Sequence, residues 1–293
     1  MKELLILSGK GGTGKTTIAG AFIQLSQAKA YADCDVDAPN LHLVMNQLNE
    51  AEKKDFYGLP VAEIDSSKCI ECDLCRQTCR FGAIYEKEGY HVDVFSCEGC
   101  GVCQWICPAE AVEMKPDIAG ELICYKDNQR VFSTAQLKMG RGTSGLLVTE
   151  VKKQMRQAKV DSRVAIIDGS PGIGCPVIAS ITGTDMVLIV AEPSLSGISD
   201  MERIIQTVER FQTKLAVCIN KADTNITHTE KIESFCNHRG IPLVGRIPFD
   251  PEAVKAINNG LTIVEVDCSS GRAAKKAYQE TIKILGNTNK KTT

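Results

Sequence analysis

Eight of the chain's 14 cysteines fall in two runs of identical spacing. The first run holds Cys69, Cys72, Cys75 and Cys79, and the second, 28 residues later, holds Cys97, Cys100, Cys103 and Cys107. Thiolates are soft ligands, so four of them per site suit iron and sulfide far better than Mg²⁺ or Ca²⁺. Zinc is the alternative, because paired C-x₂-C elements also build tetrahedral zinc sites. The repeated triplet, each with a more distant fourth cysteine, favours iron–sulfur chemistry.

The two runs resemble those of bacterial two-cluster ferredoxins, in which the fourth cysteine of one run completes the cluster of the other. The resemblance implies one [4Fe-4S] cluster on Cys69, Cys72, Cys75 and Cys107. It implies a second cluster on Cys97, Cys100, Cys103 and Cys79. The first run departs from the pattern only in carrying Arg80 where the second run has Pro108, and this change removes no ligand.

A second chemical motif lies near the N-terminus. Residues 9–16 satisfy G-x-x-x-x-G-K-[ST], after an apolar run at 4–8 and before a helical pattern. Glycines let backbone N–H groups converge on phosphate oxygens, Lys15 reaches the β- and γ-phosphates, and Thr16 supplies an oxygen to Mg²⁺. The sequence therefore predicts a nucleotide-binding set of Gly11, Gly12, Thr13, Gly14, Lys15, Thr16 and Thr17.

The elements that must position these residues alternate between strands and helices. Apolar runs at 164–168, 186–191, 215–220 and 243–247 mostly lack period-2 alternation, so we expect strands covered on both faces. Helical patterns lie between them, clearest over 200–211. We therefore predict an α/β fold with a doubly wound, mostly parallel sheet, that of a P-loop NTPase.

The cysteine-rich stretch interrupts this alternation of strands and helices. We predict an inserted α+β domain of the two-cluster ferredoxin type over residues 61–115, within a discontinuous ATPase domain of residues 1–60 and 116–293. After the insertion, a polar hairpin is expected over 121–134, turning at Asp127-Asn128, and then a helix over 144–159. The polar tail, 287–293, is expected to fray.

Lys10, a second lysine inside the phosphate loop, makes the motif more specific. The loop resembles the deviant Walker A loop of the MinD/ParA superfamily, and the whole chain resembles its members that contain an inserted ferredoxin domain. The resemblance implies that Lys10 reaches across a nucleotide-sandwich dimer to the partner's phosphates, as an arginine finger does. It implies that Asp35 orients the attacking water, and that Asp168 and Asp35 join Thr16 around Mg²⁺. Asp33 and Asp37 are second-choice Mg²⁺-shell or loop-capping groups.

Residues 220–223, Asn-Lys-Ala-Asp, match the N-K-x-D pattern that reads guanine, which taken alone favours GTP. The superfamily resemblance favours ATP, because a matching asparagine there contacts adenine and the stretch around Pro248 resembles the base-lining loop. Asn220 and Pro248 are therefore predicted to hold adenine. The expected cofactors are ATP or ADP, Mg²⁺ and two [4Fe-4S] clusters.

The resemblance implies an ATPase that is dimeric when nucleotide is bound, as a homodimer or with a similar ATPase. The leading hypothesis is that dimer switching is coupled to electron transfer through the two clusters to a partner redox protein. The alternatives are an iron–sulfur scaffold or carrier in cluster assembly, and a regulatory ATPase whose clusters sense redox state. Cys175, seven residues after Asp168, is a weaker candidate for a third, intersubunit cluster, because no suitable second cysteine precedes it.

The charge and hydropathy of the chain limit the classes of binding partner that we expect. Lys and Arg number 34 against 36 Asp and Glu, a net charge of −2 that gives no global reason to expect nucleic acid or an anionic membrane. No apolar run approaches the ~18 residues of a membrane span. The last helical pattern precedes a polar tail and not a basic amphipathic anchor, so stable membrane association is not expected. These features predict a cytoplasmic protein.

Overall fold

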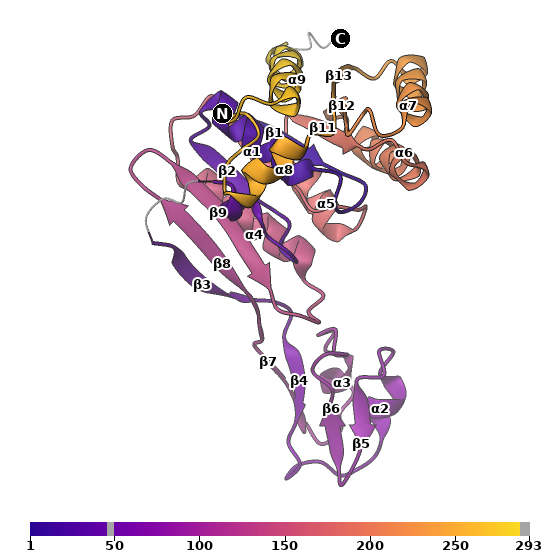
Figure 1. The fold of residues 1–293 in the computed structure, drawn as a ribbon. Coiled ribbons are helices and arrows are strands. Elements are labelled where there is room, and N and C mark those ends of the chain that lie inside the picture. Colours follow the sequence, from indigo (N-terminus) through magenta and orange to yellow (C-terminus); the bar gives the residue numbers. More distant parts are fainter. Residues whose placement is uncertain (46–49, 288–293) are drawn as a thin grey trace, which may run out of the picture.

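The computed structural model describes residues 1–45 and 50–287, and within them a nine-stranded sheet forms the centre, in the order β13-β12-β11-β1-β10-β2-β9-β8-β3 (Figure 1). The strands from β13 to β9 are parallel, while β8 and β3 join one edge antiparallel. The predicted mostly parallel sheet is thus confirmed. Its strands are β1 (Lys2–Leu7), β2 (Ala30–Asp33), β3 (Glu52–Tyr57), β8 (Ile118–Lys126), β9 (Val131–Leu137), β10 (Val164–Asp168), β11 (Met186–Ala191), β12 (Lys214–Asn220) and β13 (Leu243–Ile247).

Helices cover both faces of the sheet, because successive strand side chains point to opposite faces and both faces are apolar. Leu5 and Leu7 of β1 pack in one buried cluster with α4 to α7, and Leu4 and Ile6 pack in the other with α1 and α9. The helices here are α1 (Lys15–Ser26), the short η1 (Leu41–Leu43), α4 (Ser144–Gln157), α5 (Cys175–Ile181), α6 (Leu195–Glu209), α7 (Ile226–Arg239), α8 (Pro251–Asn258) and α9 (Ser269–Gly286).

The hairpin after the insertion differs from the expectation in one respect. Its turn lies where predicted, with the Asp127 carboxylate accepting from the backbone N–H groups of Gln129 and Arg130, both at 2.7 Å. Its second arm is not polar, because residues 131–135 are all buried. α4 covers one face of β9, and on the other face Tyr31 stacks on Phe132 at 5.1 Å. The hairpin is therefore part of the large sheet.

Residues 61–115, here called the cysteine lobe, leave the large sheet after β3 and return to it at β8. They form two small antiparallel sheets, and Figure 1 shows the lobe projecting beyond one end of the β3–β8 edge. The lobe contains β4 (Val61–Ile64), which pairs with β7 (Val112–Lys115), and β5 (Ile84–Glu86), which pairs with β6 (Tyr90–Val92). Its helices are α2 (Leu74–Thr78) and α3 (Val102–Trp105), each containing the third cysteine of one run.

Two further expectations concern the C-terminal tail and the presence of membrane-spanning helices. Of the tail predicted to fray, only Asn287 is among the described residues, and the rest lies outside them. None of the helices in residues 1–45 and 50–287 combines the length and the apolar composition needed to cross a membrane.

Candidate functional site

The phosphate loop, residues 9–16, follows β1 and leads into α1. Gly12 and Gly14 have φ angles of 79° and 90°, a left-handed conformation that favours glycine. A β-carbon on Gly14 would lie 2.2 Å from Asn220 Nδ2, so the loop is packed closely against β12. The Thr13 hydroxyl is buried and has no hydrogen-bond partner in the part of the chain that the structure describes. Such a loop, with converging amides and an unpaired hydroxyl, fits a bound phosphate.

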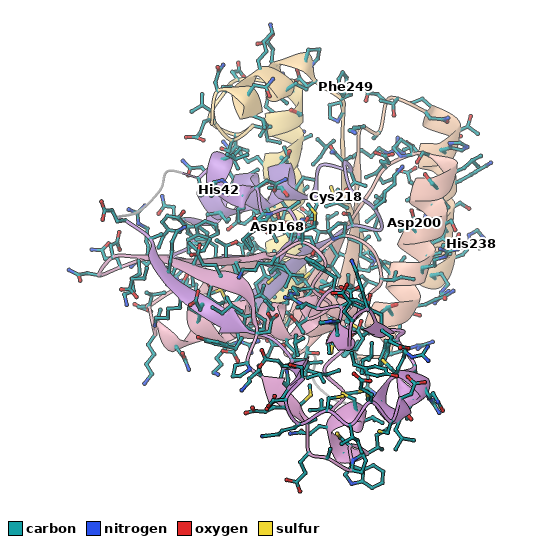
Figure 2. The ribbon with its side chains drawn as sticks, turned by 90° about the horizontal axis from the view of Figure 1, so that it is seen from below. His42, Asp168, Asp200, Cys218, His238 and Phe249 are labelled. Carbon is teal, nitrogen blue, oxygen red and sulfur yellow. The ribbon has the colours of Figure 1, made fainter. Side chains whose placement is uncertain are left out.

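Asp168 ends β10, the parallel neighbour of β1, so its side chain lies at the same sheet edge as the phosphate loop. One carboxylate oxygen accepts from Lys15 Nζ at 2.6 Å, and the other accepts from Thr16 Oγ1 at 2.6 Å. Asp168 is fully buried, and Figure 2 shows it in the interior while His238 lies on an outer helix. Two members of the predicted Mg²⁺ set, Thr16 and Asp168, are thus in direct contact.

The aspartates that follow β2 have three different environments. The Asp33 carboxylate is buried and accepts from the backbone N–H groups of Asp35, Asn40 and Leu41, each at 3.0 Å. Asp33 therefore caps the loop, one of its two predicted roles. Asp35 is half-buried, with Oδ2 3.9 Å from Lys15 Nζ, whereas Asp37 is exposed.

Burial and like charge dominate the electrostatics of this site. Burial, assisted by the neighbouring Asp168 carboxylate, raises the pKa of Asp33 to about 7. For Lys15, burial acts to lower the pKa, but the carboxylates of Asp168, Asp33 and Asp35 outweigh it and the pKa is raised. Lys15 thus remains a cation beside three carboxyl groups. A site that gathers a buried cation and several carboxyl groups beside amide donors can take a phosphate chain and a divalent ion together.

Lys10 lies at the rim of the loop and contacts its own chain. Its Nζ is 2.6 Å from Glu192 Oε1, and it donates to Ser194 Oγ at 3.2 Å and Ser196 Oγ at 3.0 Å. Glu192 also lies 3.5 Å from the Nζ of Lys221, which in turn donates to the Gly12 carbonyl at 2.9 Å. One carboxylate therefore holds two lysines on the side of the loop that faces solvent.

A pocket of about 220 Å³ opens beside the loop. Its lining includes five residues of the predicted nucleotide set, Gly12, Gly14, Thr17, Asn220 and Pro248. The amide of Asn220 donates to the Thr13 carbonyl at 2.7 Å, which ties the end of β12 to the phosphate loop. The carboxylate of Asp223, the last residue of the N-K-x-D match, accepts from the backbone N–H of Phe249 at 2.7 Å.

The phosphate loop, the paired Lys15 and Asp168, and the adjoining pocket define a P-loop nucleotide-binding protein. The chain belongs to the CobQ/CobB/MinD/ParA nucleotide-binding domain family, which matches residues 4–263. It is therefore a MinD/ParA-type P-loop ATPase.

Some relatives match nearly the whole chain, and others match only a short stretch of it. The chain is 29% identical over 283 residues to the uncharacterized protein MJ0578 of Methanocaldococcus jannaschii, covering 95% of each. Over 52 residues it is 42% identical to pyruvate synthase subunit PorD of Methanothermobacter marburgensis, covering 18% of this chain and 62% of PorD. In fold it is similar to the septum site-determining protein MinD complexed with Mg-ADP from Pyrococcus horikoshii, with a TM-score of 0.58, 17% identity and 97% of both chains covered.

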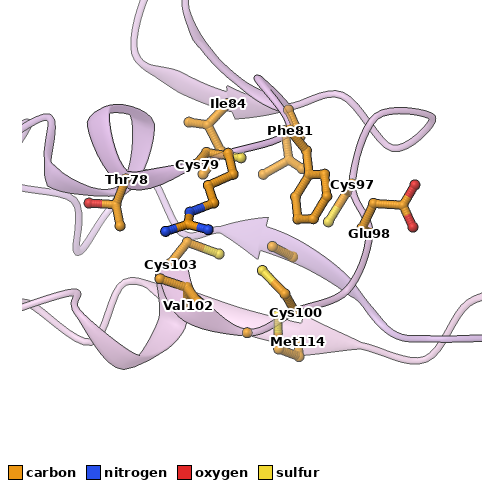
Figure 3. Close-up of a pocket in the computed structure, with 15 residues that line it drawn as sticks. Thr78, Cys79, Phe81, Ile84, Cys97, Glu98, Cys100, Val102, Cys103 and Met114 are labelled. Atoms are coloured by element: carbon orange, nitrogen blue, oxygen red, sulfur yellow. The ribbon is translucent and has the colours of Figure 1, made fainter.

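A cavity of about 420 Å³ lies inside the cysteine lobe, and four cysteines line it: Cys79, Cys97, Cys100 and Cys103. In Figure 3 their side chains face the same space, from α2's end on one side and from the second run on the other. Apolar side chains, among them Phe81, Ile84, Val92 and Met114, line much of the cavity, and Arg80 lines it as well. The structure thus brings the last cysteine of the first run to the first three of the second.

The other four cysteines form the second predicted set. Burial raises the pKa of the Cys75 thiol, and the nearby thiols of Cys69 and Cys107 add to the rise, so these three lie close together although they belong to different runs. The backbone N–H of Ala111 donates to Cys107 Sγ at 3.3 Å. Cys72 is exposed. Among the described residues, no three His, Cys, Asp or Glu side chains converge tightly enough to hold one metal ion.

Sequence reasoning missed two features of the nucleotide site. Glu192 was not singled out, although an acid directly after the buried strand β11 lies at the same sheet edge as the phosphate loop. Lys221 was noted only as part of a guanine motif, and its contact with Gly12 comes from a positive φ of 53° that turns the chain back at the end of β12. Both depend on tertiary contacts that spacing does not encode.

Proposed function

We propose that this ATPase gates electron transfer through two [4Fe-4S] clusters held in residues 61–115, a ferredoxin-like domain inserted between residues 1–60 and 116–293. One cluster takes Cys69, Cys72, Cys75 and Cys107, and the other takes Cys97, Cys100, Cys103 and Cys79. Each cluster, when bound, accepts and releases single electrons. Binding and hydrolysis of ATP then bias the conformations in which a partner redox protein receives them.

The observation that carries the proposal is the position of Cys79. If each run bound its own metal, Cys79 would face Cys69, Cys72 and Cys75. It lines instead the cavity of the second run, and this position supports the exchange of fourth ligands that two-cluster ferredoxins use. The proximity of Cys107 to Cys75 is the reciprocal half of the same exchange.

The chemistry of the donor set supports clusters over single ions. Four ligands of one zinc ion converge on a point about 2.3 Å from each sulfur. A cube instead takes one thiolate at each of its irons, so its ligands stand apart around a larger volume, as the four cysteines around the 420 Å³ cavity do. The apolar lining from Ile84, Val92 and Met114 would exclude water, and the N–H of Ala111 would stabilise charge on the Cys107 sulfur.

We propose that the nucleotide bound and hydrolysed at this site is ATP. One oxygen of the Asp223 carboxylate accepts from the N–H of Phe249, which leaves fewer acceptor sites for a guanine base. Asn220 and Pro248 then line the adenine pocket, while Thr16, Asp168 and Asp35 surround Mg²⁺. Asp35 orients the attacking water, since it is the half-buried aspartate of the loop and the nearest to Lys15 after Asp168.

The active form in this proposal is a dimer, either of two copies or with a similar ATPase. Lys10 then leaves Glu192 and reaches the partner's phosphates. The clusters are retained and not passed on, and the chain acts in the cytoplasm on a soluble redox protein. Support for a cluster-bearing lobe comes from the likeness of 52 residues to PorD, a subunit of pyruvate synthase.

The test is anaerobic purification followed by iron and sulfide analysis and EPR of the reduced chain with no nucleotide, with Mg-ADP and with Mg-ATP. We expect two cluster signals of which at least one changes with nucleotide, and no change in Lys15→Met, which cannot hold the phosphates. The proposal would be overturned if the protein contained zinc in place of iron and sulfide, or if the EPR spectra did not change with nucleotide. Rapid transfer of iron to an apo-ferredoxin would favour the carrier hypothesis instead.

A further inference from the structure

Residues 137–145 join β9 to α4, and we call them the bridge segment. The segment begins against the loop that carries Asp35. The backbone N–H of Leu137 donates to the Val36 carbonyl at 2.8 Å, and the neighbouring Gln136 side chain donates to the Asp37 carbonyl at 3.3 Å. Because Val36 follows Asp35 directly, a shift of this loop on binding nucleotide reaches Leu137 through one hydrogen bond.

The bridge segment ends against the chain that follows Asp168. Gly145, in the first turn of α4, packs on Cys175, the first residue of α5. A β-carbon on Gly145 would lie 3.2 Å from Cys175 Cβ and 3.3 Å from its carbonyl oxygen, so the two helix starts are in close contact. Only residues 169–174 separate Cys175 from Asp168. The loop that carries Asp35 and the helix start after Asp168 therefore touch the bridge segment, one at each end.

Between these ends, Arg141 contacts the cysteine lobe. Its guanidinium donates to the Val94 carbonyl at 2.8 Å and to Asp117 Oδ1 at 2.9 Å, and its centre lies 5.6 Å from the Phe95 ring centroid. Arg141 is mostly buried, with 15% of its side chain exposed. Three kinds of contact from one planar group fix the Val94–Phe95 peptide in orientation as well as in position.

The contacts of the bridge segment lie close to one cluster ligand. A β-carbon on Gly140 would lie 3.0 Å from the Phe95 ring, and one on Gly142 would lie 3.5 Å from the Glu98 carboxylate. Phe95 lies two residues before Cys97 and Glu98 directly after it, and Glu98 lines the same cavity as Cys97. The lobe thus meets the bridge segment close to a proposed ligand of the cluster that takes Cys79.

We propose that the bridge segment transmits the nucleotide state to the cluster of Cys97, with Arg141 as the positioning residue. This inference rests on the proposed function. A coupling of this kind requires an element that two sites both bias. The bridge segment has that arrangement: the loop after β2 contacts one end and the start of α5 contacts the other, and Arg141 converts a displacement between them into a displacement of the Val94–Phe95 peptide, two residues before Cys97. These contacts do not involve the ligands of the other cluster, which are Cys69, Cys72, Cys75 and Cys107.

The test compares wild type, Arg141→Ala and Arg141→Lys as loaded, full-length proteins. Arg130→Ala is the matched control, because Arg130 makes a similar ion pair with Asp127 at the opposite end of the same hairpin. The first readout is the reduction potential and EPR signal of each cluster with and without Mg-ATP. The second is hydrogen exchange of the peptide over residues 94–98, which reports on the lobe without depending on electron transfer.

In wild type and Arg130→Ala we expect nucleotide to change both readouts. In Arg141→Ala the change at the Cys97 cluster and at residues 94–98 is lost, while ATP affinity and basal hydrolysis stay as in wild type. Arg141→Lys keeps a charge near Asp117 but lacks the planar guanidinium that contacts Val94, Asp117 and the Phe95 ring together, so it restores only part of the change.

Three results contradict the inference in different ways. A full nucleotide response in a folded Arg141→Ala variant overturns the inference alone. A response confined to the other cluster also overturns it, because the bridge segment meets only one. A wild type that lacks clusters, or whose clusters ignore nucleotide, overturns the proposed function and the inference together. Should Arg141→Ala fail to fold, a full response in Arg141→Lys overturns the inference in its place.

Discussion

Lys10 Nζ lies 2.6 Å from Glu192 Oε1, so the lysine expected to cross to a partner is held by a carboxylate of its own chain. Burial acts to raise the pKa of Glu192, but Lys10 and Lys221 outweigh it and the pKa is lowered. Glu192 is therefore ionised at neutral pH. Moving Lys10 to another subunit's phosphates requires this ion pair to break, which opposes dimer formation.

Glu192→Gln is expected to strengthen the dimer formed with a non-hydrolysable ATP analogue. A partly exposed ion pair is worth about 0–1 kcal/mol, so for each pair that breaks the dimer dissociation constant should fall by up to about fivefold. Analytical ultracentrifugation measures it. Glu209→Gln, which removes an exposed ion pair with Arg239 on the outside of α6, serves as control and should change nothing. A weaker dimer in Glu192→Gln would mean that this carboxylate contacts the partner directly.

A double-mutant cycle on Lys15 and Asp168 tests the buried pair. Lys15→Met leaves Asp168 and the nearby Asp33 without their cation, so we expect a loss of about 3–5 kcal/mol in unfolding free energy without nucleotide. Asp168→Asn removes one partner of a buried lysine and should also destabilise the fold. The double variant should recover part of the loss, because the buried Asp168 charge is gone although Asp33 and Asp35 still lack their cation. Urea unfolding measures all four proteins, and additive effects would contradict the pairing.

Iron content tests the exchange of fourth ligands. Cys79→Ser should lose the cluster of the second run, about half of the iron, and Cys79→Ser with Cys97→Ser should lose no more. Cys79→Ser with Cys72→Ser should lose nearly all, because the two serines then fall in different clusters. Retention of half the iron in this last variant would assign Cys79 to its own run.

Cys175→Ser is the control for this series. Cys175 is exposed and lies outside the cysteine lobe, so its substitution should leave the iron content unchanged. A loss of iron in Cys175→Ser would instead favour the third, intersubunit cluster considered from the sequence.

Local signals predicted the parts of this structure that depend on neighbouring residues. The strand, loop and helix around Lys15 and the apolar strands β10 to β13 follow from hydrophobic runs and from glycines that one backbone path requires. The change in composition that marks residues 61–115 in the sequence coincides with the start of β4 at Val61 and the end of β7 at Lys115.

Long-range contacts account for what the sequence did not predict. β3 is mostly charged and exposed, so its place at the sheet edge depends on pairing with β8 and not on its own pattern. β9 contains buried Ser133 and Thr134, and it is part of the core because it pairs with β2 and β8 and because α4 packs on one of its faces. Glu192, Lys221 and Arg141 act through partners far away in the chain, which residue spacing does not reveal.

Lys152 provides a prediction on pH, because this buried lysine lies beneath α5. Its Nζ donates to the carbonyls of Ser180 at 2.5 Å and Thr182 at 2.7 Å, at the C-terminal end of that helix. Burial lowers the pKa of Lys152 to about 8, from 10.5. A neutral amine keeps two N–H donors, so these two contacts survive deprotonation, while the longer one to the Ala179 carbonyl at 3.4 Å is lost.

The unfolded chain therefore binds more protons than the folded one between about pH 8 and 10.5, and the free energy of unfolding contributed by Lys152 rises with pH across this window. The full rise is about 3 kcal/mol, from 1.36 kcal/mol per pKa unit. Lys152→Met removes the titration, so the difference in unfolding free energy between wild type and the variant should grow from pH 7.5 to pH 9.5 in urea denaturation. Titration of other groups is common to both proteins and cancels in that difference. A difference that stays constant with pH would mean that Lys152 remains charged, held by the helix carbonyls as a cation.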